Sequence, residues 1–282
     1  MLVPDELRKC ICFVRSERPA GPKVATGFFL GVPLGVRDQD AVYVVTARHC
    51  VRASDANELG EFTSVGLRLN TRDGKSVHVQ TDPAEWICHS TADVAILPLA
   101  LDQSTFDYLY YPVHKSATPE FIEEWGIGPG DEVLITGLLV HHPGETQILP
   151  IVRVGSVAAF PVDPILIGGQ LESAVLVEMR SISGLSGSPA FVHLPDWRRD
   201  EAGNLRELRH EEGDLAGPNY LLGLIHGVFN SKQNDPDNIG TDEALNTGIS
   251  IVVPVEKILD LIDSPERREE RQRLKDQIAI ES

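Results

Sequence analysis

The sequence predicts an all-β protein, and three observations lead to that expectation. Short runs rich in Val, Ile, Leu and Phe recur along the chain between turn signals. No long helical pattern separates these runs, as the parallel sheet of an α/β protein would require. Glycine and proline, with 24 and 19 of the 282 residues, supply the many turns that short strands need. An antiparallel barrel or sandwich satisfies all three observations.

The expected strands fall into two series of roughly equal extent. The first comprises residues 10–16, 26–32, 41–47, 65–69, 75–80 and 92–99. The second comprises residues 131–138, 148–160, 165–169, 174–180, 188–194, 220–229 and 248–255. Prolines and glycines in SATPEFIEEWGIGPG suit a segment that crosses between them. We therefore expect an amino-terminal domain over 1–112, a linker over 113–130 and a second domain over 131–255.

The carboxyl-terminal segment, residues 256–282, changes character after Pro254. Its apolar residues Ile258, Leu259, Leu261 and Ile262 form one stripe at helical spacing. A mixed charge run from 266 to 276 follows the stripe. We expect one amphipathic helix packed on the second half, with the charge run as a solvated helix end or a partner-binding tail.

Composition excludes several classes of protein. Apolar residues make up 42% of the chain and charged residues 24%, which are ordinary globular values. The net charge of −17 argues against nucleic acid as a main partner. No run of eighteen apolar residues occurs, and acidic residues stand in MLVPDELRKC where a signal peptide needs a basic and then an apolar run. We expect no membrane partner and a cytoplasmic location.

Cysteine usage agrees with a reducing compartment. Cys10, Cys12, Cys50 and Cys88 are too sparse for a disulfide scaffold in a chain of this length. The close pair Cys10 and Cys12 lacks a second pair at zinc spacing, so both are interpreted as strand residues. The sequence predicts no metal and no cofactor.

Three segments carry residues that together are able to perform nucleophilic catalysis. His49 stands in VVTARHCV, Asp93 in STADVAIL and Ser186 in SISGLSGSPAF, each at the end of a strand-like run. A serine hydroxyl is a poor nucleophile without a base in hydrogen-bond reach, and the base needs a buried carboxylate to fix its tautomer. Ser183 and Ser188 are rival hydroxyls that we interpret as scaffold. An α/β-hydrolase elbow is rejected, because GLSGS lacks the last glycine of GxSxG and the chain after Ser186 lacks alternating strands and helices.

The motifs TARHC, ADVAIL and GLSGSP resemble those of the chymotrypsin-like serine proteases in order and separation. The closing segment GISIVVPVEKILDLI resembles the final strand and helix of bacterial HtrA-type members. GLSGSP itself is more similar to bacterial glutamyl endopeptidases. The resemblance covers residues 24–262 and implies two six-stranded antiparallel β-barrels with a carboxyl-terminal helix.

The resemblance also implies a serine endopeptidase that cleaves protein or peptide substrates through an acyl-enzyme. His49 is then the general base, Asp93 its orienting carboxylate and Ser186 the nucleophile. The backbone amides of Gly184 and Ser186 form the oxyanion hole. Gly184 and Gly187 support this role, because residues without a Cβ permit the unusual turn that such donors need.

Two departures from the family bear on control. Leu185 stands where digestive members carry an Asp that pairs with a new amino terminus, so we expect no activation by amino-terminal trimming. Cys50 has no cysteine between it and Cys12 to pair with, so we expect a free buried thiol. The residues after Pro254 are too few for a PDZ-type domain. Control then falls to loops or to a regulatory protein partner.

Substrate preference rests on the same resemblance. Arg180 is expected at the base of the primary pocket, with Ile225, His226 and Gly227 in its wall. A cation there favours an acidic substrate residue. The alternative, in which Arg180 points outward to an acidic surface neighbour, stays open.

Two long segments, 193–220 and 230–247, flank the expected active-site strands. They either gate substrates or are exposed insertions. The acidic residues of the second do not match an EF-hand, so a solvated loop is expected. Two rival functions also stay open: a catalytically silent protease-fold scaffold, and an esterase that uses the same triad.

Overall fold

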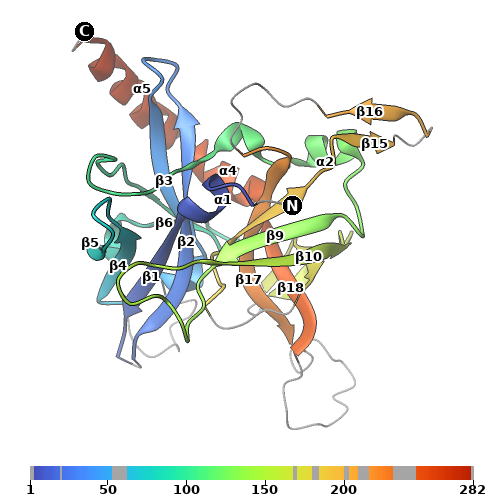
Figure 1. Ribbon diagram of the computed structural model, residues 1–282, viewed down its shortest axis with the longest axis horizontal. Coiled ribbons are helices and arrows are strands. Elements are labelled where there is room, and N and C mark those ends of the chain that lie inside the picture. The colour runs from blue at the N-terminus through green and yellow to red at the C-terminus, as the bar shows by residue number, and fades with distance from the viewer. Residues whose placement is uncertain are drawn as a thin grey trace.

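The computed structural model describes residues 3–19, 21–52, 62–167, 170–179, 184–199, 203–208, 216–230 and 246–280. The described chain is mostly β, as the sequence predicts. Figure 1 shows two neighbouring groups of strands, one from each half of the chain, with helices at the carboxyl terminus. None of the described helices is both long and apolar enough to cross a membrane.

The first half forms an eight-stranded sheet. Its strands are β1 (Ile11–Glu17), β2 (Lys23–Pro33), β3 (Asp40–Thr46), β4 (Ser64–Asn70), β5 (Ser76–Thr81), β6 (Ile87–Cys88), β7 (Ala95–Pro98) and β8 (Tyr111–Pro112). The hydrogen-bonded order is β5-β4-β1-β2-β3-β7-β6, and β8 pairs with β2 in parallel. The apolar face of this sheet is buried, with Phe28, Val44 and Leu67 all fully covered.

In the described part of the chain, the sheet order does not show the six-stranded barrel that was expected in this half. Among the described residues β5 and β6 stand at opposite ends of the sheet, and no ladder joins them. The chain between them turns at η2 (Pro83–Glu85), where the Asp82 side chain accepts a hydrogen bond from Ala84 N at 2.8 Å. Pro83 has no N–H to give to a ladder, so this capped turn ends the strand pairing.

The second half closes into a six-stranded antiparallel barrel, which confirms the prediction for that half. Its strands are β9 (Glu132–Gly137), β10 (Ile151–Ala159), β13 (Val175–Glu178), β14 (Pro189–His193), β17 (Asn219–Asn230) and β18 (Asn246–Pro254). They pair in the ring β10-β13-β18-β17-β14-β9. Val133, Ile135, Val177 and Val192 fill the interior and are fully buried. Because a closed ring has no edge strands, this half needs no partner sheet.

Two hairpins extend from the barrel. They are β11 (Ile165–Ile167) with β12 (Gln170–Glu172), and β15 (Trp197–Arg199) with β16 (Leu205–Glu207). The second belongs to the long segment 193–220 and extends away from the barrel in Figure 1. Arg198 anchors it by donating to both carboxylate oxygens of Asp131, at 2.7 and 3.0 Å. Most of the other long segment, residues 231–245, lies outside the described residues.

Short helices lie near the amino terminus, after β3 and in the segment between the two halves. They are α1 (Glu6–Lys9), η1 (Arg48–Cys50), η3 (Val113–Lys115) and α2 (Pro119–Trp125). The last two lie in the expected linker. Thr118 caps α2, and Gly126 ends it in the left-handed conformation with φ of 58°. The domain boundaries at residues 112 and 130 stay a prediction.

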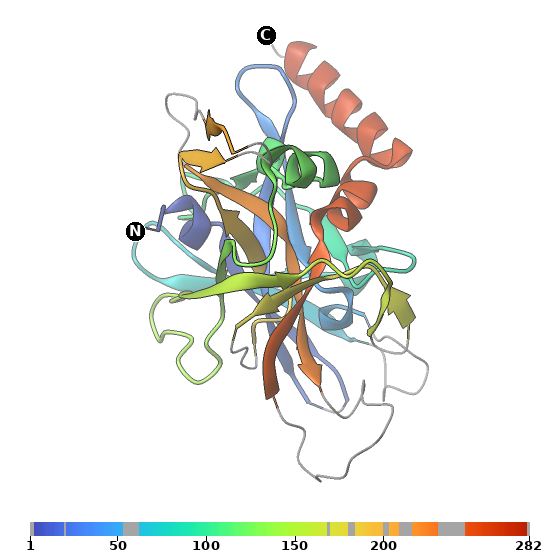
Figure 2. The ribbon, with the colours of Figure 1, turned by 90° about the vertical axis from the view of Figure 1, so that its right-hand side faces the viewer.

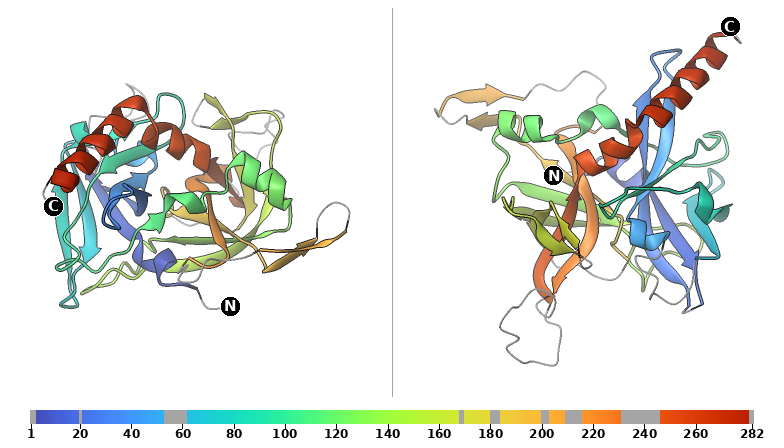
Figure 3. Two further views of the ribbon diagram at one scale, coloured as in Figure 1. Left: turned by 90° about the horizontal axis from the view of Figure 1, so that it is seen from above. Right: turned by 180° about the vertical axis from the view of Figure 1, so that it is seen from behind.

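The carboxyl terminus forms two helices where the sequence analysis expected one helix and a charged end. α4 (Val255–Ile262) buries Val255, Ile258 and Ile262 against the body, as the apolar stripe predicts. Pro265 then begins α5 (Pro265–Ile280), which carries the charge run. Figures 2 and 3 show α5 extending past the body, with the carboxyl terminus at its free end. Arg271 fixes its base by donating to Tyr43 Oη at 3.0 Å.

One apolar cluster spans the two halves. Phe191 and Leu224 of the barrel belong to the same buried cluster as Phe28 and Val44 of the sheet. The ring of Tyr111 packs on Phe191, with 4.7 Å between centroids. This shared core fixes one half against the other, so side chains from both halves are able to meet at their junction.

Candidate active site

His49 lies where β3 leaves the sheet. Ala47 is extended, and the chain then enters the single 3-10 turn η1, which contains His49. Side chains from elsewhere bond the carbonyls of that turn: Lys23 Nζ donates to His49 O at 2.9 Å, and Ser16 Oγ donates to Cys50 O at 2.6 Å. The turn is therefore fixed from outside. Cys50 is a free, buried thiol, which confirms the expectation for that residue.

Asp93 lies in the loop that leads into β7. β3 and β7 pair antiparallel, with Thr46 opposite Ala95. The segment after β3, which carries His49, and the segment before β7, which carries Asp93, therefore lie at the same end of the strand pair. The His49 backbone N–H donates to Asp93 Oδ1 at 2.9 Å, and His49 Nδ1 donates to Asp93 Oδ2 at 2.6 Å. Asp93 is only 4% exposed. These two bonds hold the imidazole in one orientation with its Nδ1–H toward the carboxylate.

Ser186 lies on a turn that only glycines permit. Gly184 and Gly187, on either side of it, have φ of +99° and +81°. A Cβ on Gly187 would lie 2.2 Å from Thr26 O, and a Cβ on Gly184 would lie 2.6 Å from Val140 Cγ2. Neither position therefore accepts a larger residue without movement.

Thr26 of β2 ties this turn to the first half. Its backbone N–H donates to Ser186 O at 2.9 Å, and its Oγ1 donates to Gly184 O at 2.7 Å. The same Oγ1 accepts a hydrogen bond from Leu138 N at 2.9 Å. One threonine thus links the first-half sheet to the backbone on both sides of Leu185.

The hydroxyl of Ser186 donates to a carbonyl, and this differs from the arrangement that the triad implies. Ser186 Oγ donates to His226 O at 3.0 Å. Among the hydrogen bonds of the described residues, none joins Ser186 to His49. The structure therefore brings His49 and Asp93 together directly and brings Ser186 to the same place through His226.

His226, which the sequence analysis expected in the wall of the primary pocket, is also a member of this cluster. Its Nδ1 donates to Asp93 Oδ2 at 2.5 Å, and its ring meets that of His49 nearly edge-on, with 5.2 Å between centroids. The ladder between β17 and β18 shifts register between Ile225 and Gly227, so His226 is the bulged residue. Bulges re-aim side chains next to active sites. The available signal was a lone histidine inside the apolar run LLGLIHGVF.

The shared carboxylate governs the charges of this cluster. Burial raises the pKa of Asp93, but the adjacent His49 and the hydrogen bond from His226 outweigh burial and hold this pKa below its ordinary value. Burial lowers the pKa of His49, whereas Cys50 and Asp93 raise it, and the net pKa of His49 lies above its ordinary value. Asp93 is therefore a carboxylate at neutral pH, and it favours a proton on the imidazole beside it.

Glu172, at the end of β12, is a second carboxyl group near the cluster. Burial and then the negative charge of Asp93 raise the pKa of Glu172, while His226 lowers it. Its Oε2 is buried and has no hydrogen-bond partner within the described part of the chain. Nothing in the sequence distinguished this glutamate from the other acidic residues, because its position depends on the hairpin.

The expected oxyanion donors are the N–H groups of Gly184 and Ser186, and the next two N–H groups along the chain are bonded within the protein. Gly187 N donates to Ile225 O at 2.7 Å, and Ser188 N donates to Leu185 O at 2.9 Å. Within the described residues the N–H groups of Gly184 and Ser186 have no protein acceptor. The expected role as oxyanion donors requires amides without a protein acceptor.

The expected specificity residues have different surroundings. Arg180 lies outside the described residues. The Ile225 side chain is 1% exposed and packs in the barrel core, while its carbonyl accepts from Gly187 N and its N–H donates to Ser188 O. The His226 ring contacts Asp93. A Cβ on Gly227 would meet no atom within 4 Å, so open space lies beside that residue.

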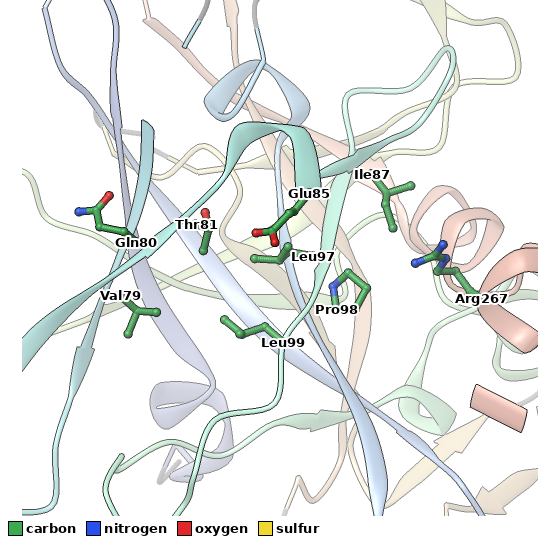
Figure 4. Close-up of a pocket in the computed structure, with 9 residues that line it drawn as sticks. All are labelled: Val79, Gln80, Thr81, Glu85, Ile87, Leu97, Pro98, Leu99 and Arg267. Carbon is green, nitrogen blue, oxygen red and sulfur yellow. The ribbon is translucent and has the colours of Figure 1, made fainter. Parts of the chain in front are cut away.

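A separate cavity of about 450 Å³ opens between the first-half sheet and α5 (Figure 4). Its lining residues are Val79, Gln80, Thr81, Glu85, Ile87, Leu97, Pro98, Leu99 and Arg267. None of the expected site residues lines it. The candidate active site is therefore the cluster at the junction of the halves and not this cavity.

Solved serine proteases share the fold. The HtrA-type protease AlgW, solved with a tripeptide, matches 92% of this chain and 61% of its own chain with a TM-score of 0.51 at 14% identity. A thermostable serine protease from an extremophilic microorganism matches 91% of this chain and 95% of its own, also with a TM-score of 0.51, at 13% identity. The protein thus spans about 61% of the length of the HtrA-type chain. No protein-family model and no curated protein matches the sequence.

Proposed function

We propose that this protein, built on the fold of trypsin-like serine proteases, is a serine endopeptidase. The observation that carries the proposal is the two-point bond between His49 and Asp93, formed beside a glycine turn that presents Ser186. A structural histidine needs neither a buried carboxylate with a second hydrogen bond nor a glycine turn that presents a hydroxyl next to it. Acyl transfer needs both.

The proposed reaction uses this chain's groups in a fixed order. His49 Nε2 removes the proton of Ser186 Oγ as the oxygen attacks the substrate carbonyl carbon, while Asp93 stabilises the resulting imidazolium. The amides of Gly184 and Ser186 donate to the oxyanion. His49 then gives its proton to the leaving amine, and an acyl-enzyme forms on Ser186. Water, deprotonated by His49, releases the acid and restores the hydroxyl.

The resting hydroxyl has to change partner before it reacts. Its bond to His226 O at 3.0 Å is a neutral hydrogen bond, with a net value of about 1 kcal/mol. Breaking a bond of this strength is a small cost compared with peptide hydrolysis. Substrate or a regulatory protein partner would supply the exchange.

Substrate and location follow as parts of the same proposal. The substrate is a protein or peptide, and a tripeptide accompanies the HtrA-type protease of similar fold. A preference for acidic residues depends on Arg180. The free thiols Cys10, Cys12 and Cys50 support a reducing, cytoplasmic setting.

Labelling with a fluorophosphonate probe tests the nucleophile. We expect labelling of the natural chain and its loss in Ser186→Ala. Ser188→Ala is the matched control, because Ser188 is fully buried on the same turn and its hydroxyl has no partner among the described residues. Label retained in Ser186→Ala, or lost in Ser188→Ala while the fold is intact by circular dichroism, would contradict the assignment.

The bond from Ser186 Oγ to His226 O favours one rival, a catalytically silent scaffold on the same fold. A scaffold would show no labelling and no turnover. Parallel assays on a protein substrate and on a small ester separate the remaining rival, because an esterase would turn over the ester and leave the protein intact.

A further inference from the structure

Three side chains from three separate segments converge on one point of the candidate active site. His49 Nδ1, Asp93 Oδ2 and His226 Nδ1 lie within 4.8 Å of one another. The first comes from the turn η1, the second from the loop before β7 and the third from the bulge in β17. Asp93 Oδ2 lies 2.6 Å from one imidazole nitrogen and 2.5 Å from the other. A triad needs only the first of these contacts.

The donor set has the chemistry of a transition-metal site. Two imidazole nitrogens and a carboxylate oxygen are the ligands that Zn²⁺ uses, whereas Mg²⁺ and Ca²⁺ prefer oxygen alone. All three residues are largely covered, with side chains 17%, 6% and 23% exposed for His49, Asp93 and His226. Covered ligands on fixed elements lose little freedom when they bind a cation.

Glu172 adds a second, independent observation. Its Oε2 is buried without a hydrogen-bond partner among the described residues, and Asp93 raises the pKa of its carboxyl group while His226 lowers it. A divalent cation at this point would offset the negative charge of Asp93 and displace the protons from the imidazole nitrogens that it binds. A dication beside Asp93 would also remove the repulsion that Glu172 experiences from that carboxylate.

We propose that His49, Asp93 and His226 form a binding site for Zn²⁺ or a similar divalent transition-metal ion, and that the bound ion switches off the proposed peptidase. The binding part stands on the donor set alone. The inhibitory part rests on the proposed function.

Binding needs a small rearrangement of the three ligands. Zinc–nitrogen and zinc–oxygen bonds are about 2.0–2.2 Å long, so tetrahedral ligand atoms lie roughly 3.3–3.5 Å apart. The present separations from Asp93 Oδ2 are shorter, since they are hydrogen bonds. Side-chain rotations that open them by somewhat less than an ångström would admit the ion between the same three atoms.

Inhibition follows from where the proton goes. Zinc binds the lone pair of Nδ1, so the Nδ1 proton of each neutral imidazole has to leave that atom. The imidazole then carries its proton on Nε2. With Nε2 of His49 already protonated, the base has no lone pair for the proton of Ser186. The ion therefore holds His49 in the tautomer that cannot activate the nucleophile.

Binding is tested on the full-length Ser186→Ala chain without a histidine tag. We expect one Zn²⁺ per chain by isothermal titration calorimetry, and the visible absorption of tetrahedral Co²⁺ when Co²⁺ replaces it. His226→Gln should weaken binding at least tenfold. His78→Gln, an exposed histidine on β5, is the matched control and should bind like its parent. Equal zinc affinity in His226→Gln and its parent, or no binding by the folded parent, would overturn the site.

Inhibition is tested on the natural chain with the fluorophosphonate probe. We expect Zn²⁺ to abolish labelling and a chelator to restore it, with at least a tenfold higher zinc concentration needed in His226→Gln. Zinc that binds without slowing the labelling would overturn the inhibitory part. A chain that is never labelled, yet binds zinc through His226, would contradict the proposed peptidase and leave the metal site in place.

Discussion

The two halves of the molecule hold their parts of the candidate site by different means. In the first half, paired strand ends bring His49 and Asp93 together, and side-chain hydrogen bonds fix them. In the second half, positive-φ glycines and a bulge fix Ser186 and His226 through the backbone of a closed barrel. The base and acid thus depend on side-chain chemistry, whereas the nucleophile depends on backbone shape. Substitutions that change only the side-chain chemistry or only the backbone shape test this difference between the halves.

The largest expected effect comes from the first half. Asp93→Asn keeps the shape of the side chain but removes its charge, so His49 loses the acceptor that selects its tautomer. We expect the labelling rate to fall by about 10⁴-fold, as for the acid of other such triads. Asp102→Asn, at an exposed turn, should label at the natural rate. A loss of less than tenfold in Asp93→Asn would show that the carboxylate charge does not control the base.

The next effect tests the backbone of the second half. Gly187→Ala introduces a Cβ at φ of +81°, against Thr26 O and Thr46 Oγ1. We expect the free energy of unfolding in urea to fall by about 2–4 kcal/mol from strain and overpacking together. Gly126→Ala carries a positive φ with no atom near its Cβ, so it should lose only about 1–2 kcal/mol. Equal losses would mean that the close packing at Gly187 contributes nothing.

A smaller effect is expected where the halves meet. Thr26→Val keeps the volume but removes the hydroxyl that bonds Gly184 O and Leu138 N. We expect about 1–3 kcal/mol lower stability in urea and slower labelling, because a buried N–H loses its acceptor beside the serine turn. Thr63→Val, with an exposed hydroxyl bonded to Glu17 O, should change neither. Natural labelling in Thr26→Val would show that the turn holds without the first half.

The smallest effect is expected for the thiols of the first half, whose reactivity reports whether the sheet keeps solvent and reagents from its core. Burial raises the pKa of the Cys12 thiol to about 12, and that of Cys10 further. Burial also raises the pKa of Cys88, but that thiol is partly exposed. Under native conditions we expect iodoacetamide to modify Cys88 first and to leave Cys10, Cys12 and Cys50 unmodified, as read by mass spectrometry. Modification of Cys12 as fast as Cys88 would show that the sheet opens readily.

The strand pattern predicted a barrel or a sandwich, and the resemblance to chymotrypsin-like proteases implied two closed barrels, of which the structure shows the one in the second half. Alternating apolar residues locate strands, but a sheet closes into a barrel only if its two edge strands pair with each other. The capped turn at Asp82 and Pro83 and the two-residue strand β6 decide that question, and their effect is visible only in the folded chain. The start of α5 at Pro265 was not predicted, although proline at the first position of a helix is a known helix-start signal.

The site shows the same limit. His49 and Asp93 were predictable from motifs because strand ends carry them, and the structure joins them as expected. His226 and Glu172 reach Asp93 through a bulge and a hairpin, and neither feature has a distinctive residue pattern. A sequence therefore identifies the residues of a motif more readily than the neighbours that the fold adds to it.

At the bulge, the side chain and the backbone of residue 226 make separate contacts in the candidate site. The ring bonds Asp93, while the main-chain oxygen of the same residue accepts the hydroxyl of Ser186. Every amino acid supplies that oxygen, but few supply an imidazole. A substitution at residue 226 therefore removes the imidazole that contacts Asp93 but keeps the carbonyl oxygen that accepts the hydrogen bond from Ser186.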